Sequence, residues 1–480
     1  MPSAAKPSEP TTTRPPKPRR GEVLELRVES VAQGGAGVAR NDGLVVFVEG
    51  GYPGDSVRAE VTKAKRDFAH ARAVEIVEPS PDRVPIRCDH EGGECPGSPW
   101  QALRYDRQLE YKQELLGDAL RRLGRHEGFE LEPFVPADEI WRYRNKLEYS
   151  FGPSSNPSAG LPADGSHALV LGFHQRGRWD TVLDARDCML ASERSNAVRN
   201  HVRDWCRSEG LGAYDRRRNH GFLRNLVVRE GIRTGALQLR LVTSEGVFNA
   251  DAFAESVLDR FPDAGILWTR THGVAEVSHG GTTSLLAGSQ TLDEQLLDLR
   301  FQISPEAFFQ TNTSMAERLY SLAADYAALE GSERVYDLYC GIGTLSLVLS
   351  LRAGEVWAVD VVETAIADAI GNARLNEIDN AHFFAGDMRN AIRPLAERAP
   401  RPDVVVVDPP RAGLSQKVVR RLLELVPSRI VYVSCNPTTL APNARQMVDG
   451  GYRLVKVRGV DMFPHTPHLE CVAVLERAHG

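Results

Sequence analysis

Two side chains near the C-terminus have the types and positions that covalent catalysis requires. Cys435 follows the apolar run Ile430–Ser434, and a thiol at the end of a buried strand is where a nucleophile would stand. Glu470 precedes the apolar run Cys471–Leu475, so its carboxylate lies at the mouth of a strand and has the chemistry of a general base. Each also has a plainer interpretation, because most cysteines are small buried hydrophobes and a glutamate can simply cap a strand.

A glycine turn after Val335–Tyr339 has the chemistry of a nucleoside site. Gly341 and Gly343 allow close backbone approach to a ligand, and Asp360 follows 19 residues after Gly341, at the end of the next strand. That spacing brings a carboxylate to ribose hydroxyls. The run lacks the third glycine of a dinucleotide site and the Gly-Lys-Ser/Thr of a phosphate loop. S-adenosylmethionine, a nucleoside without a pyrophosphate, therefore fits better, and a bare strand–turn–helix is the alternative.

A proline pair stiffens the loop after the apolar strand Val404–Asp408. Pro409 and Pro410 hold the backbone at the strand's carboxyl end and so determine where Asp408 points. Methyltransferases that act on amino groups usually place an aromatic residue after such a pair, to stack the target base. Arg411 stands there instead, which argues against attack on an exocyclic nitrogen. For a lone proline pair the default interpretation is a structural turn.

The elements that must position these residues alternate between strands and helices. Four apolar strand-like runs with helical stretches between them lie in the last 180 residues: Val335–Tyr339, Val356–Asp360, Val404–Asp408 and Ile430–Ser434. This alternation predicts a doubly wound, Rossmann-like parallel sheet, whose ligands bind at the carboxyl ends of its strands.

The segment after the basic N-terminus carries β signals only. Leu24, Leu26 and Val28 alternate with polar residues, tight turns follow, and five short strands in under 60 residues predict a small barrel. Four basic residues flank Phe68, a mixture suited to RNA phosphates and a stacked base, or else a solvated strand edge. These basic residues are Lys63, Lys65, Arg66 and Arg72.

The middle of the chain combines a cysteine pair, a helix and basic runs. Cys88 and Cys95 precede a helix with Leu109, Leu116, Leu120 and Leu123 on one face and with Arg107, Lys112, Arg121 and Arg122 mostly off it. The basic runs at 142–146 and 216–220 are interleaved with Trp141, Tyr143 and Phe222. They predict RNA contact or a plain solvated face.

Composition excludes several classes of protein. At 480 residues the chain suggests three domains of roughly 100–200 residues, and 42% hydrophobic with 25% charged residues is typical of globular proteins. It has no apolar run of the ~18 residues that a membrane span needs, and residues 1–20 lack the apolar stretch of a secretory signal. Net charge is −6, so an RNA site must be a local basic patch. Seven cysteines fit a reducing compartment, and we expect a cytoplasmic protein.

Taken together, the motifs resemble one family closely, the S-adenosylmethionine-dependent RNA 5-methyluridine (uracil-C5) methyltransferases. The resemblance is carried by DLYCGIGT, DPPRAG, SCNP and DMFPHTPHLE in this order, and residues 21–61 resemble the RNA-binding TRAM domain. It implies a multidomain α/β protein whose parts are a disordered basic tail (1–20), a TRAM-like, OB-like barrel (21–79), a cysteine-containing segment with a helix (80–131), a central mixed α/β RNA-binding domain (132–300) and a methyltransferase domain (301–480).

The resemblance also assigns roles. Cys435 would add to uracil C6, the methyl group would pass from S-adenosylmethionine to C5, and Glu470 would remove the C5 proton. Asp408 would help to orient the pyrimidine within the shared pocket of substrate and cofactor. The matching cofactor-binding positions are Gln310, Tyr339, Thr344, Asp360, Asp387 and Asp408. The family often has asparagine where Thr344 stands.

Some family members hold an iron–sulfur cluster on four cysteines. Here Cys88 and Cys95 match the first two and Cys188 the fourth, but Ser98 stands where the third is expected, and serine is a poor soft ligand. The sequence therefore argues against a stable [4Fe-4S] cluster.

The implied partner is RNA, and we expect no membrane association and a monomer. The substrate expected from the TRAM-like domain is 23S ribosomal RNA, with transfer RNA as the alternative. An RNA chaperone with a vestigial catalytic domain is a rival, which the presence of Cys435, Glu470 and Asp408 argues against. A cytosine-C5 RNA methyltransferase is a second rival. It would need a cysteine in the proline loop, which has none.

Overall fold

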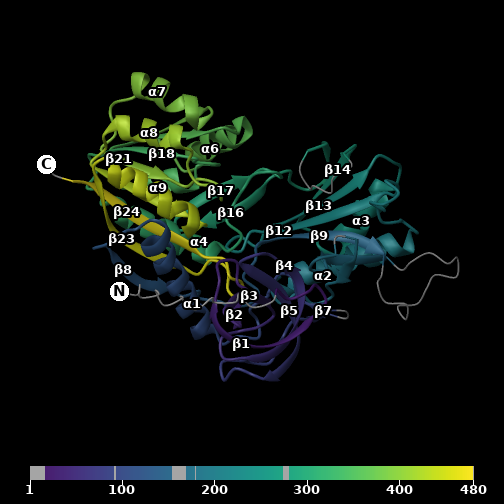
Figure 1. Ribbon diagram of the computed structural model, residues 1–480. Coiled ribbons are helices and arrows are strands. Elements are labelled where there is room, and N and C mark those ends of the chain that lie inside the picture. Colours follow the sequence, from purple (N-terminus) through teal and green to yellow (C-terminus); the bar gives the residue numbers. More distant parts are fainter. Residues whose placement is uncertain (1–16, 91–92, 154–168, 179, 274–279, 479–480) are drawn as a thin grey trace, which may run out of the picture. The chain divides into compact units, whose positions relative to one another are not determined.

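The computed structural model describes residues 17–90, 93–153, 169–178, 180–273 and 280–478 (Figure 1). Most of the predicted basic tail, residues 1–16, lies outside them. The chain divides into two compact units, the first formed by the residues up to Pro85 with Ala102–Arg107, the second by the rest. Among the described helices, none is both long and apolar enough to cross a membrane.

The first unit is a closed five-stranded barrel with strand order β1-β2-β3-β5-β4, which confirms the predicted small barrel. Its strands are β1 (Val23–Val31), β2 (Gly37–Asn41), β3 (Leu44–Glu49), β4 (Ser56–Ala64) and β5 (Phe68–Glu78). Leu24, Leu26 and Val28 point into the barrel core, as their alternation predicts. The β2–β3 turn places Asp42 and Gly43 at positive φ, a conformation that glycine adopts freely.

The helix after the cysteine pair differs from its sequence prediction in two respects. It consists of α1 (Tyr105–Asp118) and a π-helical segment, η1 (Ala119–Leu123), and is preceded by the short strands β6 (Asp89–His90) and β7 (Gly93–Glu94). Leu123 is 57% exposed, so its expected place on the apolar face is wrong. The wider π-helical turn breaks the 3.6-residue register that carries Leu116 and Leu120 into the core. Lys112 was expected mostly off that face and is instead fully buried.

The second unit contains a mixed seven-stranded sheet, with strand order β11-β10-β9-β12-β13-β14-β15. Its strands are β9 (Lys146–Pro153), β10 (Leu169–His174), β11 (Val182–Asp184), β12 (Leu223–Glu230), β13 (Leu237–Ser244), β14 (Ala264–Thr271) and β15 (Thr282–Ala287). Its apolar face packs with residues of α2 (Glu193–Ser208) and α3 (Ala250–Arg260) in one core.

The C-terminal part is an eight-stranded sheet with order β20-β19-β18-β21-β22-β24-β23-β8. The strands from β20 to β22 run parallel, β24 is antiparallel to both of its neighbours, and β8 extends the edge. Its strands are β8 (Glu130–Val135), β18 (Arg334–Leu338), β19 (Glu355–Asp360), β20 (Ala381–Ala385), β21 (Val404–Val407), β22 (Arg429–Ser434), β23 (Tyr452–Val460) and β24 (Glu470–Arg477). The four predicted strands are all present, and the doubly wound parallel sheet is confirmed.

Helices cover both faces of this sheet (Figure 1). One apolar core takes in α7 (Met388–Arg398), α8 (Gln416–Leu425) and α9 (Pro437–Asp449). The core on the opposite face takes in α4 (Thr313–Ala327), α5 (Thr344–Ser350), α6 (Glu363–Leu375) and the hairpin of β16 (Leu292–Leu296) and β17 (Leu299–Ile303). Because both faces are covered, ligands have access at the strand ends, where the predicted site residues lie.

Candidate active site

Three neighbouring strands bring the predicted catalytic side chains to one edge of the sheet. Asp408 follows β21, Cys435 follows β22, and Glu470 begins the adjacent strand β24. Ser434 pairs with Cys471 in the antiparallel β22–β24 ladder, so Cys435 and Glu470 are the next residues outward on the two strands. Cys435 and Glu470, which are 35 positions apart in the chain, therefore face each other across the end of one ladder.

Burial raises the pKa values of all three acids in this group, and neighbouring negative charges raise two of them further. Burial raises the pKa of the Cys435 thiol to about 11, and the charges of Glu470 and Asp408 raise it further. Burial also raises the pKa of Asp408 to about 7 and that of Glu470 well above its usual range. Asp408 keeps some accessible surface although protein surrounds it, as expected of a group that lines a cleft. Without RNA, Cys435 is therefore a neutral thiol at neutral pH.

Arg411 supplies the positive charge of this edge. Its Nη2 donates to Nδ1 of His468 at 3.1 Å, and its charge lowers the pKa values of both Glu470 and Cys435 against the effect of burial. Burial and the Arg411 charge lower the pKa of His468 to about 4, so the imidazole is neutral and can accept this bond. Arg411 thus favours ionisation of the thiol and of the carboxyl group.

The glycine turn after β18 has the shape of a nucleoside site. Asp360 accepts the N–H groups of Gly341 at 3.0 Å and of Val362 at 2.9 Å, which orients its carboxylate at the end of β19. A Cβ atom at Gly341 would meet no atom within 4 Å, so the turn borders open space. Tyr339 holds a left-handed backbone at φ 75°, a strain that clusters at ligand sites. This donor and acceptor set fits a ribose and its base without a pyrophosphate.

The other predicted cofactor-binding residues have distinct surroundings. Gln310 and Thr344 are buried, and Thr344 Oγ1 donates to the hydroxyl of Tyr320 at 3.4 Å. Asp387 begins α7 as its N-cap and pairs with Arg389 at 2.5 Å, and this guanidinium lowers the pKa of Asp387 to about 2. A ligand would therefore meet the Asp387–Arg389 ion pair, whose charges cancel. At Asp408 it would meet a carboxyl group for which the described residues show no ion pair.

Two residues of this region are not apparent from the sequence. Tyr320 on α4 is 3% exposed, and its pKa is raised mainly by burial, then by the Asp408 charge, with Gln310 and Thr344 as hydrogen-bond neighbours. Burial raises the pKa of Asp337 to about 7, although Ser346 donates to it at 2.5 Å. Tyr320 reads as an ordinary core aromatic in the helical pattern, and only its position ten residues after Gln310 hints at the pocket.

The barrel presents an aromatic platform, formed by Phe47, Phe68 and His70, on its outer surface. The ring centroids lie 5.4 to 5.7 Å apart, because the parallel β3–β5 pairing aligns Phe47 with His70. Beside it lies a basic patch, formed by Lys63, Lys65 and Arg66, for which no ion pair is present among the described residues. Arg72, by contrast, pairs with Glu49 at 3.6 Å. The sequence predicted the basic residues and Phe68 as RNA contacts. That Phe47 and His70 lie beside Phe68 is apparent only from the strand pairing.

The basic run at 142–146 is packed into the protein. Trp141 stacks on His465 with ring centroids 3.8 Å apart, and the buried Tyr143 hydroxyl donates to the carbonyl of Pro464 at 3.1 Å. Asn145 Nδ2 donates to the Gln310 carbonyl at 2.8 Å. The interleaved aromatics of this run therefore hold the loop before Glu470 and are not an exposed base-stacking surface.

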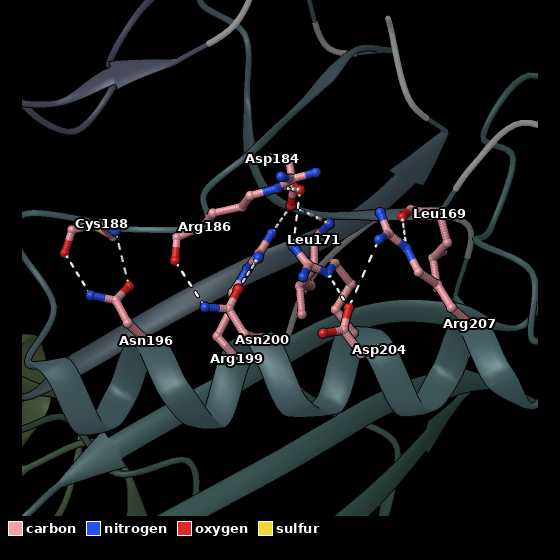
Figure 2. A network of polar contacts seen from close by, with 11 residues as sticks. Leu169, Leu171, Asp184, Arg186, Cys188, Asn196, Arg199, Asn200, Asp204 and Arg207 are labelled. Atoms are coloured by element: carbon pink, nitrogen blue, oxygen red, sulfur yellow. Dashed lines mark hydrogen bonds and ion pairs between the residues drawn. The ribbon is translucent and has the colours of Figure 1, made fainter. Parts of the chain in front are cut away.

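The cysteine-containing segment lies against a loop held by α2. Figure 2 shows Asn196 bracketing Cys188: its Oδ1 accepts from the Cys188 N–H at 2.9 Å and its Nδ2 donates to the Cys188 carbonyl at 3.0 Å. Hydrogen bonding with Cys95 and burial raise the pKa of Cys88. Ser98 Oγ is buried without a hydrogen-bond partner. Among the described residues, no three His, Cys, Asp or Glu side chains are grouped so that they could hold a metal ion.

Taken together, the doubly wound sheet, the nucleoside-shaped turn and the thiol at the strand ends define a class I S-adenosylmethionine-dependent methyltransferase. Residues 288–478 match the family model described as tRNA (Uracil-5-)-methyltransferase, and residues 17–74 match the TRAM domain. The chain belongs to this family of RNA (uracil-5-)-methyltransferases, with a TRAM domain at its N-terminus.

Relatives extend over nearly the whole chain. An uncharacterized RNA methyltransferase of Halalkalibacterium halodurans is 36% identical over 459 residues, covering 95% of this chain and 97% of the relative. One of Porphyromonas gingivalis is 38% identical over 467 residues, covering 94% and 99%. The crystal structure of Pyrococcus abyssi tRNA (uracil-54, C5)-methyltransferase, in complex with S-adenosyl-L-homocysteine, is 29% identical with a TM-score of 0.74, covering 94% of this chain and 100% of that one.

Proposed function

We propose that this chain forms 5-methyluridine in RNA, with Cys435 as the nucleophile and Glu470 as the general base. The observation that carries the proposal is the convergence of Cys435, Asp408 and Glu470 at adjacent strand ends, each with its pKa raised by burial. Perturbed acids gathered at one place are typical of catalytic sites.

The chemistry follows from the weak nucleophilicity of uracil C5. The Cys435 thiol releases its proton to water as its sulfur bonds to C6, and the C5=C6 electron pair moves to make C5 an enolate carbon. S-adenosylmethionine supplies the methyl group that C5 takes up. The Glu470 carboxylate then removes the remaining C5 proton, and the C6–S bond breaks to restore C5=C6 and release the Cys435 thiolate. Glu470 must therefore be ionised for this last step, which the nearby Arg411 favours.

The residues proposed to hold the methyl donor fit a nucleoside. Asp360 would accept ribose hydroxyls with the lone pairs that Gly341 and Val362 leave open. Tyr339 would lie against the base, while Gln310, Thr344 and Asp387 would complete the pocket. Asp408 is shared between cofactor and pyrimidine in this proposal. With a pKa of about 7 it can donate or accept a hydrogen bond.

The proposed substrate is 23S ribosomal RNA, bound in part by the TRAM barrel. Base stacking on the aromatic platform and phosphate contacts with the basic patch would hold a single strand. Transfer RNA is the second candidate. It is favoured by the Pyrococcus abyssi tRNA (uracil-54, C5)-methyltransferase, which aligns with 94% of this chain. Mapping 5-methyluridine by mass spectrometry in both RNAs of a deletion strain would decide between them.

The cysteine-containing segment is proposed to hold no stable [4Fe-4S] cluster. The hydrogen bond with Cys95 and burial raise the pKa of Cys88 and so oppose its ionisation, and Ser98 offers a hydroxyl where a thiolate would be needed. Iron and sulfide analysis of anaerobically purified protein should find substoichiometric cluster. A full complement of four irons in the unaltered protein would contradict the proposal.

The catalytic proposal is tested with two variants. Cys435→Ala should abolish methylation while S-adenosylmethionine still binds, because the thiol attacks uracil and not the sulfonium. Glu470→Gln should add to C6 and accept the methyl group but stall, which leaves a denaturation-resistant protein–RNA adduct that carries the labelled methyl group. Free methylated RNA at the unaltered rate from either variant would remove that residue from its role.

A further inference from the structure

The loop that leads to Glu470 is buried to a degree that is unusual for a connection between strands. Residues 461–469 join β23 to β24, and Asp461, His465 and Thr466 are among the buried polar residues of this loop. Connecting segments normally lie at the surface, because water satisfies their polar groups there. In this loop, protein groups from distant segments must replace that water.

The first anchor of this loop is a buried ion pair. Lys112 Nζ on α1 lies 2.5 Å from Asp461 Oδ1 and donates to the carbonyl of Phe463 at 3.0 Å, and both charged side chains are completely buried. Replacing such a pair with apolar residues is often neutral or stabilising, because removing two charges from water is costly. The pair is therefore better explained by the geometry it imposes at Asp461. That residue directly follows Val460, the ladder partner of Glu470.

The second anchor lies one helical turn earlier on α1. Gln108 Oε1 accepts from the His465 N–H at 2.8 Å, and its Nε2 donates to His465 Nδ1 at 3.1 Å and to the Trp100 carbonyl at 3.2 Å. The Trp100 N–H in turn donates to the His465 carbonyl at 2.9 Å. His465 has φ 63°, a left-handed conformation that is strained in a residue with a side chain. Three of these bonds reach His465 and hold it in this conformation.

The far end of the loop forms one wall of the active site. The His468 N–H donates to Thr466 Oγ1 at 3.2 Å, and His468 Nδ1 accepts from Arg411 at 3.1 Å. Arg411 is the cation that acts on Glu470 and Cys435. A shift of the loop at Asp461 or His465 would therefore move Glu470, whereas Arg411, whose carbonyl accepts from Asn436 and Thr439, would stay beside Cys435.

We propose that Gln108 and Lys112 are positioning residues for Glu470, so that helix α1 determines how the base meets the C5 proton of the covalently held uracil. The proposal rests on the function proposed above. It assigns to α1 a role in the second half of the reaction only. Addition of Cys435 and uptake of the methyl group depend on other strand ends and should continue without these anchors.

The test uses two variants that preserve packing volume. Gln108→Met removes the three side-chain bonds, and the double variant Lys112→Met/Asp461→Leu removes both buried charges together. Gln113→Met is the matched control, because Gln113 lies on the same helix but donates to the Glu132 carbonyl instead. Each is incubated with RNA and methyl-labelled S-adenosylmethionine, and the labelled denaturation-resistant adduct is measured beside free methylated RNA.

In Gln108→Met and Lys112→Met/Asp461→Leu, the two α1 variants, we expect turnover to fall about tenfold, equivalent to about 1.4 kcal/mol in the activation barrier. The labelled adduct should accumulate, the affinity for S-adenosylmethionine should stay within about twofold, and Gln113→Met should behave as the unaltered protein does. A general loss of structure would lower adduct formation as well. Lost turnover without adduct, or full turnover in both variants, would overturn the inference.

Glu470→Gln is measured in parallel to separate the two claims. If it traps the labelled adduct and the α1 variants do not, the positioning role is wrong and the base assignment stands. If Glu470→Gln itself traps none, the proposed base is wrong and the inference falls with it.

Discussion

Asp408→Asn should stabilise the folded protein above neutral pH. Asp408 is a largely buried carboxylic acid that keeps some accessible surface, and burial raises its pKa from 3.8 to about 7. Because the folded pKa exceeds the unfolded one, ionisation is disfavoured in the folded state. The penalty is absent below about pH 4, grows from about pH 4 to pH 7, and is complete above that. Asparagine has the same shape and no charge, so it avoids the penalty.

The magnitude follows from the shift. About three pKa units at about 1.4 kcal/mol each give about 4 kcal/mol as an upper bound, and relaxation with water entry should reduce this to about 2 kcal/mol. Asp408 lies in the second, larger unit, and in a unit of that size 1 kcal/mol moves the Tm by about 2 °C. The variant should therefore melt about 4 °C higher at about pH 8 and almost equally at about pH 4.

Differential scanning calorimetry of the full chain across this pH range checks the prediction. Asp387→Asn is the control of opposite sign, since Arg389 lowers the pKa of Asp387 and its charge is favoured in the folded state. It should gain no stability at alkaline pH. The reasoning is refuted if Asp408→Asn melts no higher than the unaltered protein at about pH 8, or if its gain is the same at about pH 4.

Three further predictions concern the thiol and the barrel. Iodoacetamide should modify Cys435, the one cysteine that is not buried, faster as pH rises through the alkaline range. Glu470→Gln should speed this modification at about pH 9, because it removes a nearby negative charge. Peptide mapping that finds no acceleration would contradict the effect of Glu470 on the thiol. Replacing the basic patch with alanines should flatten the salt slope of RNA binding by about 2, whereas replacing Arg72, already paired with Glu49, should change it less. Phe68→Leu on the aromatic platform should weaken RNA binding by about 1–3 kcal/mol without altering that slope, and a changed slope would argue against stacking.

The sequence alone carried the features that depend on near neighbours in the chain. Alternation at Leu24, Leu26 and Val28 predicted barrel strands, because a strand's two faces are set by its own residues. The apolar runs before Asp408 and Cys435 predicted parallel strands, and sheet topology then places their carboxyl ends on one edge. The expected site residues could therefore be named before any tertiary contact was known.

Tertiary structure decided what depends on partners far along the chain. Lys112 looks like a solvent-facing residue of an amphipathic helix, yet its partner Asp461 lies 349 positions later. Leu123 follows the apolar spacing of its helix, but a π-helical turn carries it into solvent. Tyr320 resembles any core aromatic until folding sets its hydroxyl beside Thr344. Local patterns report which side of an element is apolar, whereas burial of a charge or hydroxyl depends on the group that compensates it, and only the folded chain supplies that group.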